Sequence, residues 1–521
     1  MSGGSKRLNR YTFDPDRPQL QAPDSDEMNP LLGSQQSGAA PTMTSKGMFR
    51  MFACSFIATI GSLIFGYCLG FSSPALVDPL LVKDILGESA QNWFSSIINI
   101  GAAIGGVSTS AIAVKFGRKG TIMFAGLPYA IGWLLVLLPA YLHTLDGVSN
   151  SLLVSLLLVG RALSGAGLGI ASGIISIYIS EIATPAYRGF LGTCFQLSVT
   201  IGLLLSYLLG RELAHYPWLA TVALVLTASL VVLGLWIPES PRALLLKNRP
   251  DEARRSLEWL RGGPGVDVGR ELQDIEKTLM DQEPFALGEL SKPTIWKPFA
   301  VALGLMFFQQ FSGINAVAFY ASVIFDGVGS SFQEKNGPLI IAVDQVVATA
   351  IAALVMDKLG RRKLLVLSGT LQCLSIVALG VFFQVNHCLN VKEPSDSPCT
   401  SSPEVGPLSL VALIVYMTGF SFGWGAIPWL LMSEILPSKA RTIAGGVCTF
   451  FVWMCSFAVT YMFNSLTKLI HKNGTFYFFG GWAFASVIFV LLFVPETKGK
   501  TLEDIEMYFE RGNKRAINDD S

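Results

Sequence analysis

The sequence predicts an all-α membrane protein with twelve transmembrane helices in two six-helix lobes. Its 521 residues are 51% hydrophobic and only 14% charged, with a mean hydropathy of +0.50, whereas a soluble domain carries about 25% charged residues. Twelve apolar runs reach the length of about 20 residues that a helix needs to cross a hydrocarbon core. In addition, three charged motifs occur once in each half of the chain, in the same order.

The twelve runs form two groups of six. We expect them to be helical because a lipid-exposed backbone must satisfy its hydrogen bonds internally. The first lobe, residues 47–237, holds the runs 48–71, 91–114, 120–142, 151–173, 188–209 and 217–237. The second lobe, residues 298–495, holds the runs 298–324, 337–357, 364–385, 407–432, 442–465 and 476–494.

The segments outside the lobes are polar. Residues 1–46 are rich in Pro, Ser, Gly and Asp, which predicts a disordered tail. Residues 238–297 form a charged linker, in which 251–260 and 271–279 have the spacing of short amphipathic helices. Residues 496–521 form a second tail. The loop 386–406 contains Cys388 and Cys399, which could form a disulfide in an oxidising compartment.

The repeated charged motifs follow the ends of apolar runs and are separated by 243, 253 and 257 residues. Their loops and the linker carry most of the Lys and Arg found between the runs, so the positive-inside rule places these loops in the cytosol. With twelve crossings, both termini are then cytosolic. The motif pairs are Gly117-Arg118-Lys119 with Gly360-Arg361-Arg362, Glu181…Arg188 with Glu434…Arg441, and Pro238-Glu239-Ser240 with Pro495-Glu496-Thr497.

Six motifs in a fixed order resemble the sugar porters of the major facilitator superfamily, and in particular the facilitative glucose transporters. They are Gly117-Arg118-Lys119, Arg161-Ala162-Leu163-Ser164-Gly165, Pro238-Glu239-Ser240-Pro241-Arg242, Gln309-Gln310-Phe311-Ser312-Gly313-Ile314-Asn315, Gly425-Ala426-Ile427-Pro428-Trp429 and Pro495-Glu496-Thr497-Lys498-Gly499. The similarity spans roughly residues 47–510. It implies the major facilitator fold, with sugar bound near the midplane between two six-helix repeats. An acidic dileucine motif at residues 27–32, described below, and the loop 386–406 are most similar to the intracellular, class III members of that family.

Charged residues near the bilayer need partners, because an unpaired charge there costs several kcal/mol. We expect carboxylates of one lobe to pair with arginines of the other while the cytosolic side is closed, so that these residues form a cytoplasmic gate. The alternative is that the charges only set the topology and are hydrated. The predicted gate residues are Arg118, Glu181, Arg188, Glu239, Asp357, Arg361, Glu434, Arg441 and Glu496.

A sugar site needs amide groups for the hydroxyls and aromatic rings for the C–H faces, but no charge. Several amides lie within spans, where an unsatisfied amide is costly, although such amides also bond neighbouring helices. The predicted sugar-contacting residues are Gln196, Gln309, Gln310, Asn315, Gln345, Trp429 and Trp453. The resemblance also implies that Phe319 and Tyr320 close an outer gate.

The chain departs from the family pattern at several positions. Ala426 stands where the family has a proline, which predicts a weaker kink in that span, and Ser456 stands where asparagine is frequent. Glucose is the expected substrate, with a disaccharide as an alternative. Cys68 follows Phe65-Gly66-Tyr67 where proton-coupled relatives carry an Asp, which favours uniport. Asp344, a carboxylate within a span, leaves proton symport open.

The N-terminal tail contains Glu27-Met28-Asn29-Pro30-Leu31-Leu32, which has the form of an acidic dileucine signal. We expect Glu27, Leu31 and Leu32 to bind clathrin adaptor complexes and to direct the protein to endosomal, lysosomal or other vesicle membranes, with cycling to the plasma membrane. Asn473-Gly474-Thr475 is an acceptor sequence for N-glycosylation.

The sequence lacks the motifs that would indicate an enzyme, a metal site or an ATP-driven pump. The four histidines are scattered over loops without metal-ligand spacing, and no ATP-binding loop occurs. We therefore expect no enzyme activity, no metal and no cofactor, and partners limited to a sugar, the lipid bilayer and the adaptors, without nucleic acid. A non-transporting sugar sensor would have the same membrane domain and stays an alternative.

Overall fold

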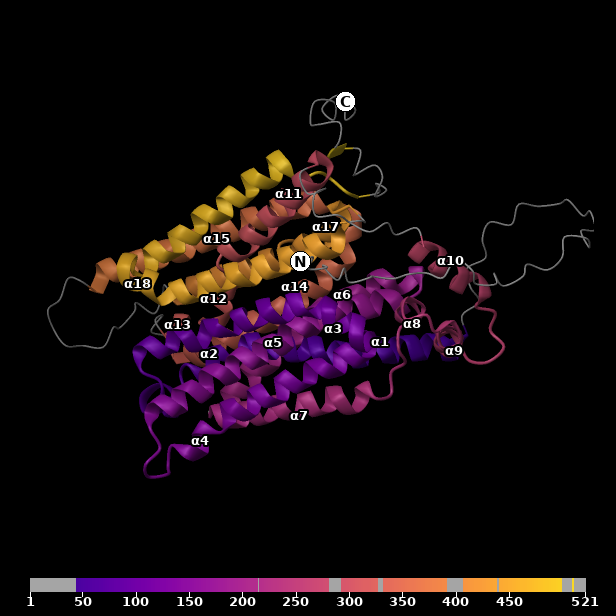
Figure 1. Ribbon diagram of the computed structural model, residues 1–521. Coiled ribbons are helices and arrows are strands. Elements are labelled where there is room, and N and C mark those ends of the chain that lie inside the picture. Colours follow the sequence, from indigo (N-terminus) through magenta and orange to yellow (C-terminus); the bar gives the residue numbers. More distant parts are fainter. Residues whose placement is uncertain are drawn as a thin grey trace, which may run out of the picture. The chain divides into compact units, whose positions relative to one another are not determined.

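The computed structural model describes residues 44–213, 215–280, 292–326, 331–390, 406–437, 440–498 and 508–509 (Figure 1). Regular structure in these residues is helical. The first lobe contains α1 (Ser45–Gly70), α2 (Ser72–Ala75), the π-helix Leu80–Ile85, α3 (Glu88–Leu137), α4 (Pro139–Leu142), α5 (Asn150–Ile182), α6 (Pro185–Leu213) and α7 (Tyr216–Gly234). The second contains α11 (Pro293–Phe311), α12 (Ile314–Phe319), α13 (Ala321–Asp326), α14 (Ser331–Leu359), α15 (Arg361–Asn390), α16 (Gly406–Phe422), α17 (Ile427–Ile435) and α18 (Arg441–Phe493).

Twelve membrane crossings follow from the helix lengths. Ten helices of the described residues are long and apolar enough to span a membrane. Two of them, in α3 and α18, have 53 and 51 residues, about 75–80 Å at 1.5 Å per residue and more than twice the core thickness. Each is interrupted by non-helical residues, at Gly117 in α3 and at Ile470 and His471 in α18. Counting each as two crossings gives the twelve that the sequence predicts.

The turn at Gly117 is built by its own residues. Gly117 has φ 82°, a conformation that favours glycine, and a β-carbon here would collide with the Glu239 carboxylate. Gly360, before α15, repeats the arrangement with φ 89° and the Glu496 carboxylate. The end of the bundle that carries these two turns is called the charged end below, and the other end the opposite end.

Within the first lobe α3 packs against α5 and α7, and α1 against α6. In the second lobe α18 packs against α15 and α11, and α14 and α15 against α16 (Figure 1). The lobes meet where α3 contacts α18 and where α6 contacts α14. These two helix pairs form most of the seam between the lobes, and α12 and α13 add contacts with α1 and α2.

The linker carries three short helices, α8 (Pro241–Leu246), α9 (Pro250–Arg261) and α10 (Gly269–Met280). The predicted helices 251–260 and 271–279 are thus confirmed as α9 and α10. Arg261 is buried and holds this segment to the first lobe, because its guanidinium bonds Glu271 at 2.5 Å and donates to the Ile182 carbonyl at 3.1 Å.

Candidate functional site

A chain of uncharged polar side chains lies at the break between α11 and α12 in the second lobe. The Asn315 Nδ2 group donates to Gln310 Oε1 at 2.6 Å and to Ser456 Oγ at 2.7 Å. Gln310 lies in the last turn of α11 and Asn315 in the first turn of α12, on either side of Gly313, whose φ of 93° breaks the helix. The two predicted amides are therefore brought together by the helix break.

Gln309 faces a different partner. Its Nε2 group donates to the carbonyls of Trp424 at 2.7 Å and Gly425 at 3.2 Å. These carbonyls belong to residues 423–426, which separate α16 from α17. The sequence predicts a weak kink here because Ala426 replaces a proline, yet the helix is interrupted. Gln309 and the Ser368 hydroxyl, which bonds the Trp424 N–H at 3.2 Å, satisfy the freed backbone.

The remaining predicted sugar contacts are distributed over several helices. Gln345 on α14 and Trp453 on α18 are buried, and Gln345 Oε1 and Trp453 Nε1 have no hydrogen-bond partner in the described residues. Trp453 packs on Phe65 of the first lobe, with ring centroids 5.7 Å apart. Gln196 on α6 and Trp429 on α17 are half-buried. The structure gives neither of these two a hydrogen bond to the amide chain.

The predicted outer gate lies next to the amide chain, towards the opposite end of the bundle. Phe319 and Tyr320 are buried. The Tyr320 ring stacks on Phe463, with centroids 4.8 Å apart, and its hydroxyl donates to the Thr460 carbonyl at 3.3 Å. Tyr207 of the first lobe donates to the Ala318 carbonyl at 2.5 Å. The aromatic pair is thus packed into the seam.

Asn99 is a further polar residue of the site that was not predicted, although it lies within the apolar run 91–114. Asn99 Oδ1 accepts from Ser456 Oγ at 2.9 Å, and its Nδ2 group donates to Thr460 Oγ1 at 3.1 Å. It therefore joins α3 of the first lobe to α18 of the second. An amide within an apolar run was the signal that could have identified it.

Further hydrogen bonds join the lobes towards the opposite end. The hydroxyls of Ser73 on α2 and Ser322 on α13 lie 2.8 Å apart. Asn464 Nδ2 donates to Asn92 Oδ1 at 2.6 Å, again between α18 and α3. Together with Asn99 and Tyr207, these contacts hold the lobes together in this half of the molecule.

At the charged end of the first lobe, Arg118 forms a two-pronged ion pair with Glu181, at 2.9–3.2 Å. Glu181 also accepts from the Ser240 hydroxyl at 2.5 Å. The Glu239 carboxylate accepts from the backbone N–H groups of Arg118, Lys119 and Ser240, at 2.8–3.1 Å. A carboxylate at the start of a helix is favourable because backbone N–H groups there lack partners.

The second lobe repeats this cluster. Arg361 lies 3.6 Å from Glu434, which accepts from the Thr497 hydroxyl at 2.7 Å. Glu496 accepts from the N–H groups of Arg361 and Arg362 at 3.0 and 3.2 Å. Arg118 and Arg361 thus each pair with a glutamate of their own lobe. The expected pairs between lobes apply to the state in which the cytosolic side is closed, and they stay a prediction.

Three predicted gate residues take no described part in these clusters. Arg188, at the start of α6, is exposed. Asp357 and Arg441 lie in α14 and α18, but their side chains are outside the described residues. The gate role of all nine residues stays a prediction.

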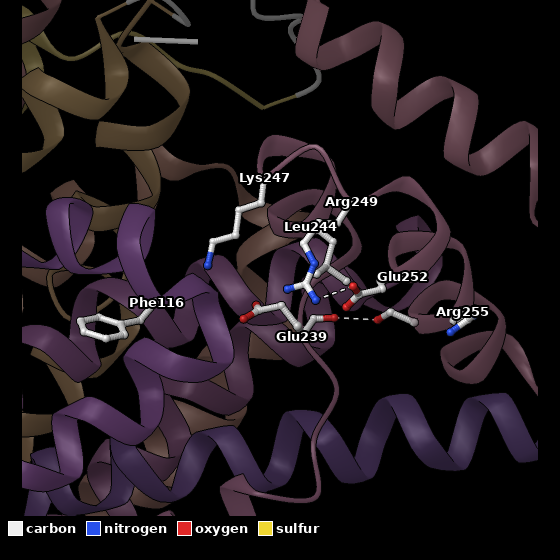
Figure 2. A pocket seen from close by; sticks show the side chains of 8 residues that line it. Phe116, Glu239, Leu244, Lys247, Arg249, Glu252 and Arg255 are labelled. Atoms are coloured by element: carbon white, nitrogen blue, oxygen red, sulfur yellow. Dashed lines mark hydrogen bonds and ion pairs between the residues drawn. The ribbon is translucent and has the colours of Figure 1, made fainter. Parts of the chain in front are cut away.

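A cavity of about 460 Å³ lies at the charged end of the first lobe (Figure 2). Figure 2 shows Lys247 and Arg249 above Glu239, with Phe116 to the left and Glu252 to the right. Among its charged residues, Arg249 pairs with Glu252, and Lys247 Nζ donates to the Lys115 carbonyl at 3.1 Å. Because it is lined mostly by charged side chains rather than amides, this cavity does not have the chemistry of a sugar site.

Asp344 and Arg161 are the charged residues within spans that bear on proton coupling. Both carboxylate oxygens of Asp344 lie within 2.9–3.1 Å of the Thr418 hydroxyl on α16. Arg161 is fully buried, donates to Ser72 Oγ at 2.6 Å and lies 3.3 Å from the Cys68 carbonyl. Cys68 itself is buried beside this guanidinium.

Glu27, Leu31, Leu32 and Cys399 lie outside the described residues, as does the side chain of Cys388. Asn473 is half-buried in the first turn after the interruption of α18. Thr475 of the same acceptor sequence is buried and donates to the His471 carbonyl at 2.9 Å. Glycosylation of Asn473 stays a prediction.

Twelve apolar crossings in two lobes, with an uncharged polar chain at the seam and matching charged clusters at one end, define a membrane transporter of the major facilitator class. Comparisons with known proteins agree. The family model "Sugar (and other) transporter" matches residues 54–509. The chain belongs to this sugar transporter family, whose members transport solutes and are not enzymes.

Individual relatives cover almost the whole chain. It is 36% identical over 504 residues to the mouse (Mus musculus) "Solute carrier family 2, facilitated glucose transporter member 8", covering 94% of this chain and 99% of the relative. It is 37% identical over 459 residues to the "Facilitated trehalose transporter Tret1" of Apis mellifera ligustica, covering 87% and 86%. Among solved structures, the partially occluded inward open xylose transporter XylE from E. coli matches with a TM-score of 0.72 and 25% identity, covering 87% and 100%.

Proposed function

We propose that this protein carries a hexose, with D-glucose as the first candidate, across its membrane by facilitated diffusion and alternating access. The observation that carries the proposal is the uncharged chain Gln310–Asn315–Ser456–Asn99, which runs from the break between α11 and α12 to the seam between the lobes. The similarity to facilitated glucose transporters over 94% of the chain supports the same substrate class.

The chemistry of these side chains suits a sugar. Amides donate and accept at once, as sugar hydroxyls do. Gln309 Oε1, Gln345 Oε1 and Trp453 Nε1 are buried without a partner in the described part of the chain, and a bound hydroxyl would satisfy each of them. Uncharged groups bind a sugar without holding it so tightly that release becomes slow.

In alternating access, the two ends of the seam would open and close in turn. The hydrogen bonds of Ser73 and Asn92 keep the opposite end together, while Arg118 and Arg361 are paired within their own lobes at the charged end. We propose that, when the charged end closes, these arginines and glutamates exchange partners across the seam and so form the cytoplasmic gate.

Proton-coupled symport is a second candidate, favoured by the carboxylate of Asp344 in α14. Uniport is preferred because this carboxylate binds Thr418 of α16, and because Cys68 rather than an acid lies beside Arg161. Uptake into proteoliposomes with and without an inward proton gradient separates the two. Uniport predicts equilibration in both cases, whereas accumulation above equilibrium that follows the gradient would establish symport.

The substrate is tested by uptake of radiolabelled D-glucose into liposomes containing the purified protein, with D-fructose, D-galactose and trehalose as competitors. We expect saturable uptake in which D-glucose competes best. Preferential competition by trehalose would instead assign the disaccharide that is named for the insect relatives. Uptake no faster than into protein-free liposomes would contradict transport and favour the sugar sensor.

We further propose that both termini are cytosolic and that Glu27, Leu31 and Leu32 direct the protein to endosomal or lysosomal membranes through clathrin adaptors. The basis is the acidic dileucine pattern and the excess of Lys and Arg in the loops at the charged end. Replacing Leu31 and Leu32 by Ala should move a fluorescently tagged protein to the plasma membrane. An unchanged vesicular distribution would contradict the sorting role.

A further inference from the structure

Asn99 occupies a position from which it acts on both lobes. It is fully buried in α3, as are Ser456 and Thr460 in α18. These two residues lie four apart and therefore share one face of the helix, and the Asn99 amide bonds both of them, at 2.9 and 3.1 Å. Ser456 lies midway along the crossing 441–469, the depth at which transporters of this class bind substrate.

The hydrogen bonds from Asn99 have a defined direction. The single proton of the Ser456 hydroxyl is donated to Asn99 Oδ1. A lone pair of the same hydroxyl is then free to accept from Asn315 Nδ2 at 2.7 Å. The second proton of this Nδ2 group is donated to Gln310 Oε1 at 2.6 Å. Asn99 thus determines, through Ser456, which way the two amides of the candidate sugar site are turned.

This orientation decides which atoms the site offers. With both Nδ2 protons and Gln310 Oε1 in use, Asn315 keeps its Oδ1 acceptor and Gln310 keeps its Nε2 donors. An acceptor and a donor side by side complement a sugar hydroxyl, which both donates and accepts. The same turn of α18 also contacts the predicted outer gate, because the Tyr320 hydroxyl donates to the Thr460 carbonyl.

We propose that Asn99 is a positioning residue of the sugar site, which through Ser456 fixes Asn315 and Gln310 in the orientation that binds a hexose. This deepens the proposed function and rests on it. Because Asn99 belongs to the first lobe and its partners to the second, the orientation holds while α3 and α18 are in contact. Separation of the lobes at the opposite end breaks both bonds to Asn99 and releases the amides.

The chain provides a matched control. Asn92 lies seven residues before Asn99, on the same face of α3, and its amide also bonds α18, at Asn464. The structure gives Asn92 no hydrogen bond to Ser456 or Asn315. Asn92→Leu therefore removes an amide contact between the same two helices without a link to the sugar site.

The test measures equilibrium binding of radiolabelled D-glucose to the purified full-length protein in detergent. Asn99→Leu and Ser456→Ala should each raise the Kd about tenfold, with a larger change in KM than in kcat for uptake. The double variant should bind no more weakly than either single variant, because both remove the same link. Asn92→Leu also removes one of the bonds that keep the opposite end closed, so it should change the Kd, but by no more than about threefold. Should Asn99→Leu not fold, Ser456→Ala tests the same link.

Three results would overturn the inference. Asn99→Leu and Asn92→Leu could have the same effect on the Kd, which would make Asn99 a contact between helices only. The effects of Asn99→Leu and Ser456→Ala on the Kd could be additive, which would show that Asn99 does not act on Asn315 through Ser456. Wild-type protein that neither binds nor transports D-glucose would contradict the proposed function, and this inference with it.

Discussion

The two arginine–glutamate pairs at the charged end occupy equivalent positions but differ in geometry. Arg118 and Glu181 are 14% and 7% exposed and form a two-pronged contact at 2.9 Å, whereas Arg361 and Glu434 are 15% and 22% exposed and lie 3.6 Å apart. Two-pronged arginine–carboxylate pairs are the stronger kind. Loss of one partner is most costly where the other stays buried.

We therefore predict that Glu181→Gln destabilises the protein by about 2–3 kcal/mol and Glu434→Gln by about 1 kcal/mol or less. The measurement is the apparent Tm of the purified variants in detergent. Glu258→Gln serves as the control, because Glu258 pairs with the exposed Arg254 one turn away on α9 and should change Tm very little. Equal shifts for Glu181→Gln and Glu434→Gln would contradict this comparison.

At the scale of elements, two interrupted helices shape the centre of the second lobe. The break between α11 and α12 could be predicted from the sequence, because Gly313 lies inside an amide-rich apolar run. The break between α16 and α17 was underestimated, because it depends on Gln309 and Ser368 from other helices and not on Ala426 alone. Local sequence patterns do not contain such contacts between distant segments.

The same distinction applies to the charged clusters. The repeated motifs identified Arg118, Glu181, Arg361 and Glu434 as members, but not their partners. The partner of each arginine depends on a contact between distant segments. The Glu239 and Glu496 carboxylates accept hydrogen bonds from the backbone N–H groups of Arg118 and Arg361, and so hold each arginine next to the glutamate of its own lobe. Asn99 was missed because a single amide in an apolar run has many explanations until its neighbours on α18 are known.

Gly313 allows a prediction at this scale. Its φ of 93° costs an alanine about 1–2 kcal/mol, and a β-carbon would lie 2.9 Å from the Phe479 ring. Gly313→Ala should therefore lower the apparent Tm and slow sugar uptake. Gly446→Ala is the control, since a β-carbon there meets no atom within 4 Å and alanine favours the helix. A Gly313→Ala protein as stable and active as Gly446→Ala would rule out a required break.

For the whole molecule, the proposed alternating access requires that the seam between the lobes opens at one end at a time. Closure of the opposite end is carried by contacts between first-lobe and second-lobe residues, from Ser73 and Ser322 to Asn92 and Asn464. Each hydrogen bond between membrane helices is worth only about 0.6 kcal/mol on average. A few such bonds hold the end closed and still allow it to open during transport.

A disulfide across this end would hold it closed and so shows whether transport requires it to open. The Ser73 and Ser322 hydroxyl oxygens lie 2.8 Å apart, so cysteines at both positions can bring their sulfurs to bonding distance with little adjustment. The measurement is radiolabelled D-glucose uptake into liposomes by Ser73→Cys/Ser322→Cys protein, oxidised and then reduced, beside both single variants. Alternating access predicts that oxidation of the double variant stops uptake, that reduction restores it, and that the single variants do not respond. Undiminished uptake by fully cross-linked protein would contradict the account.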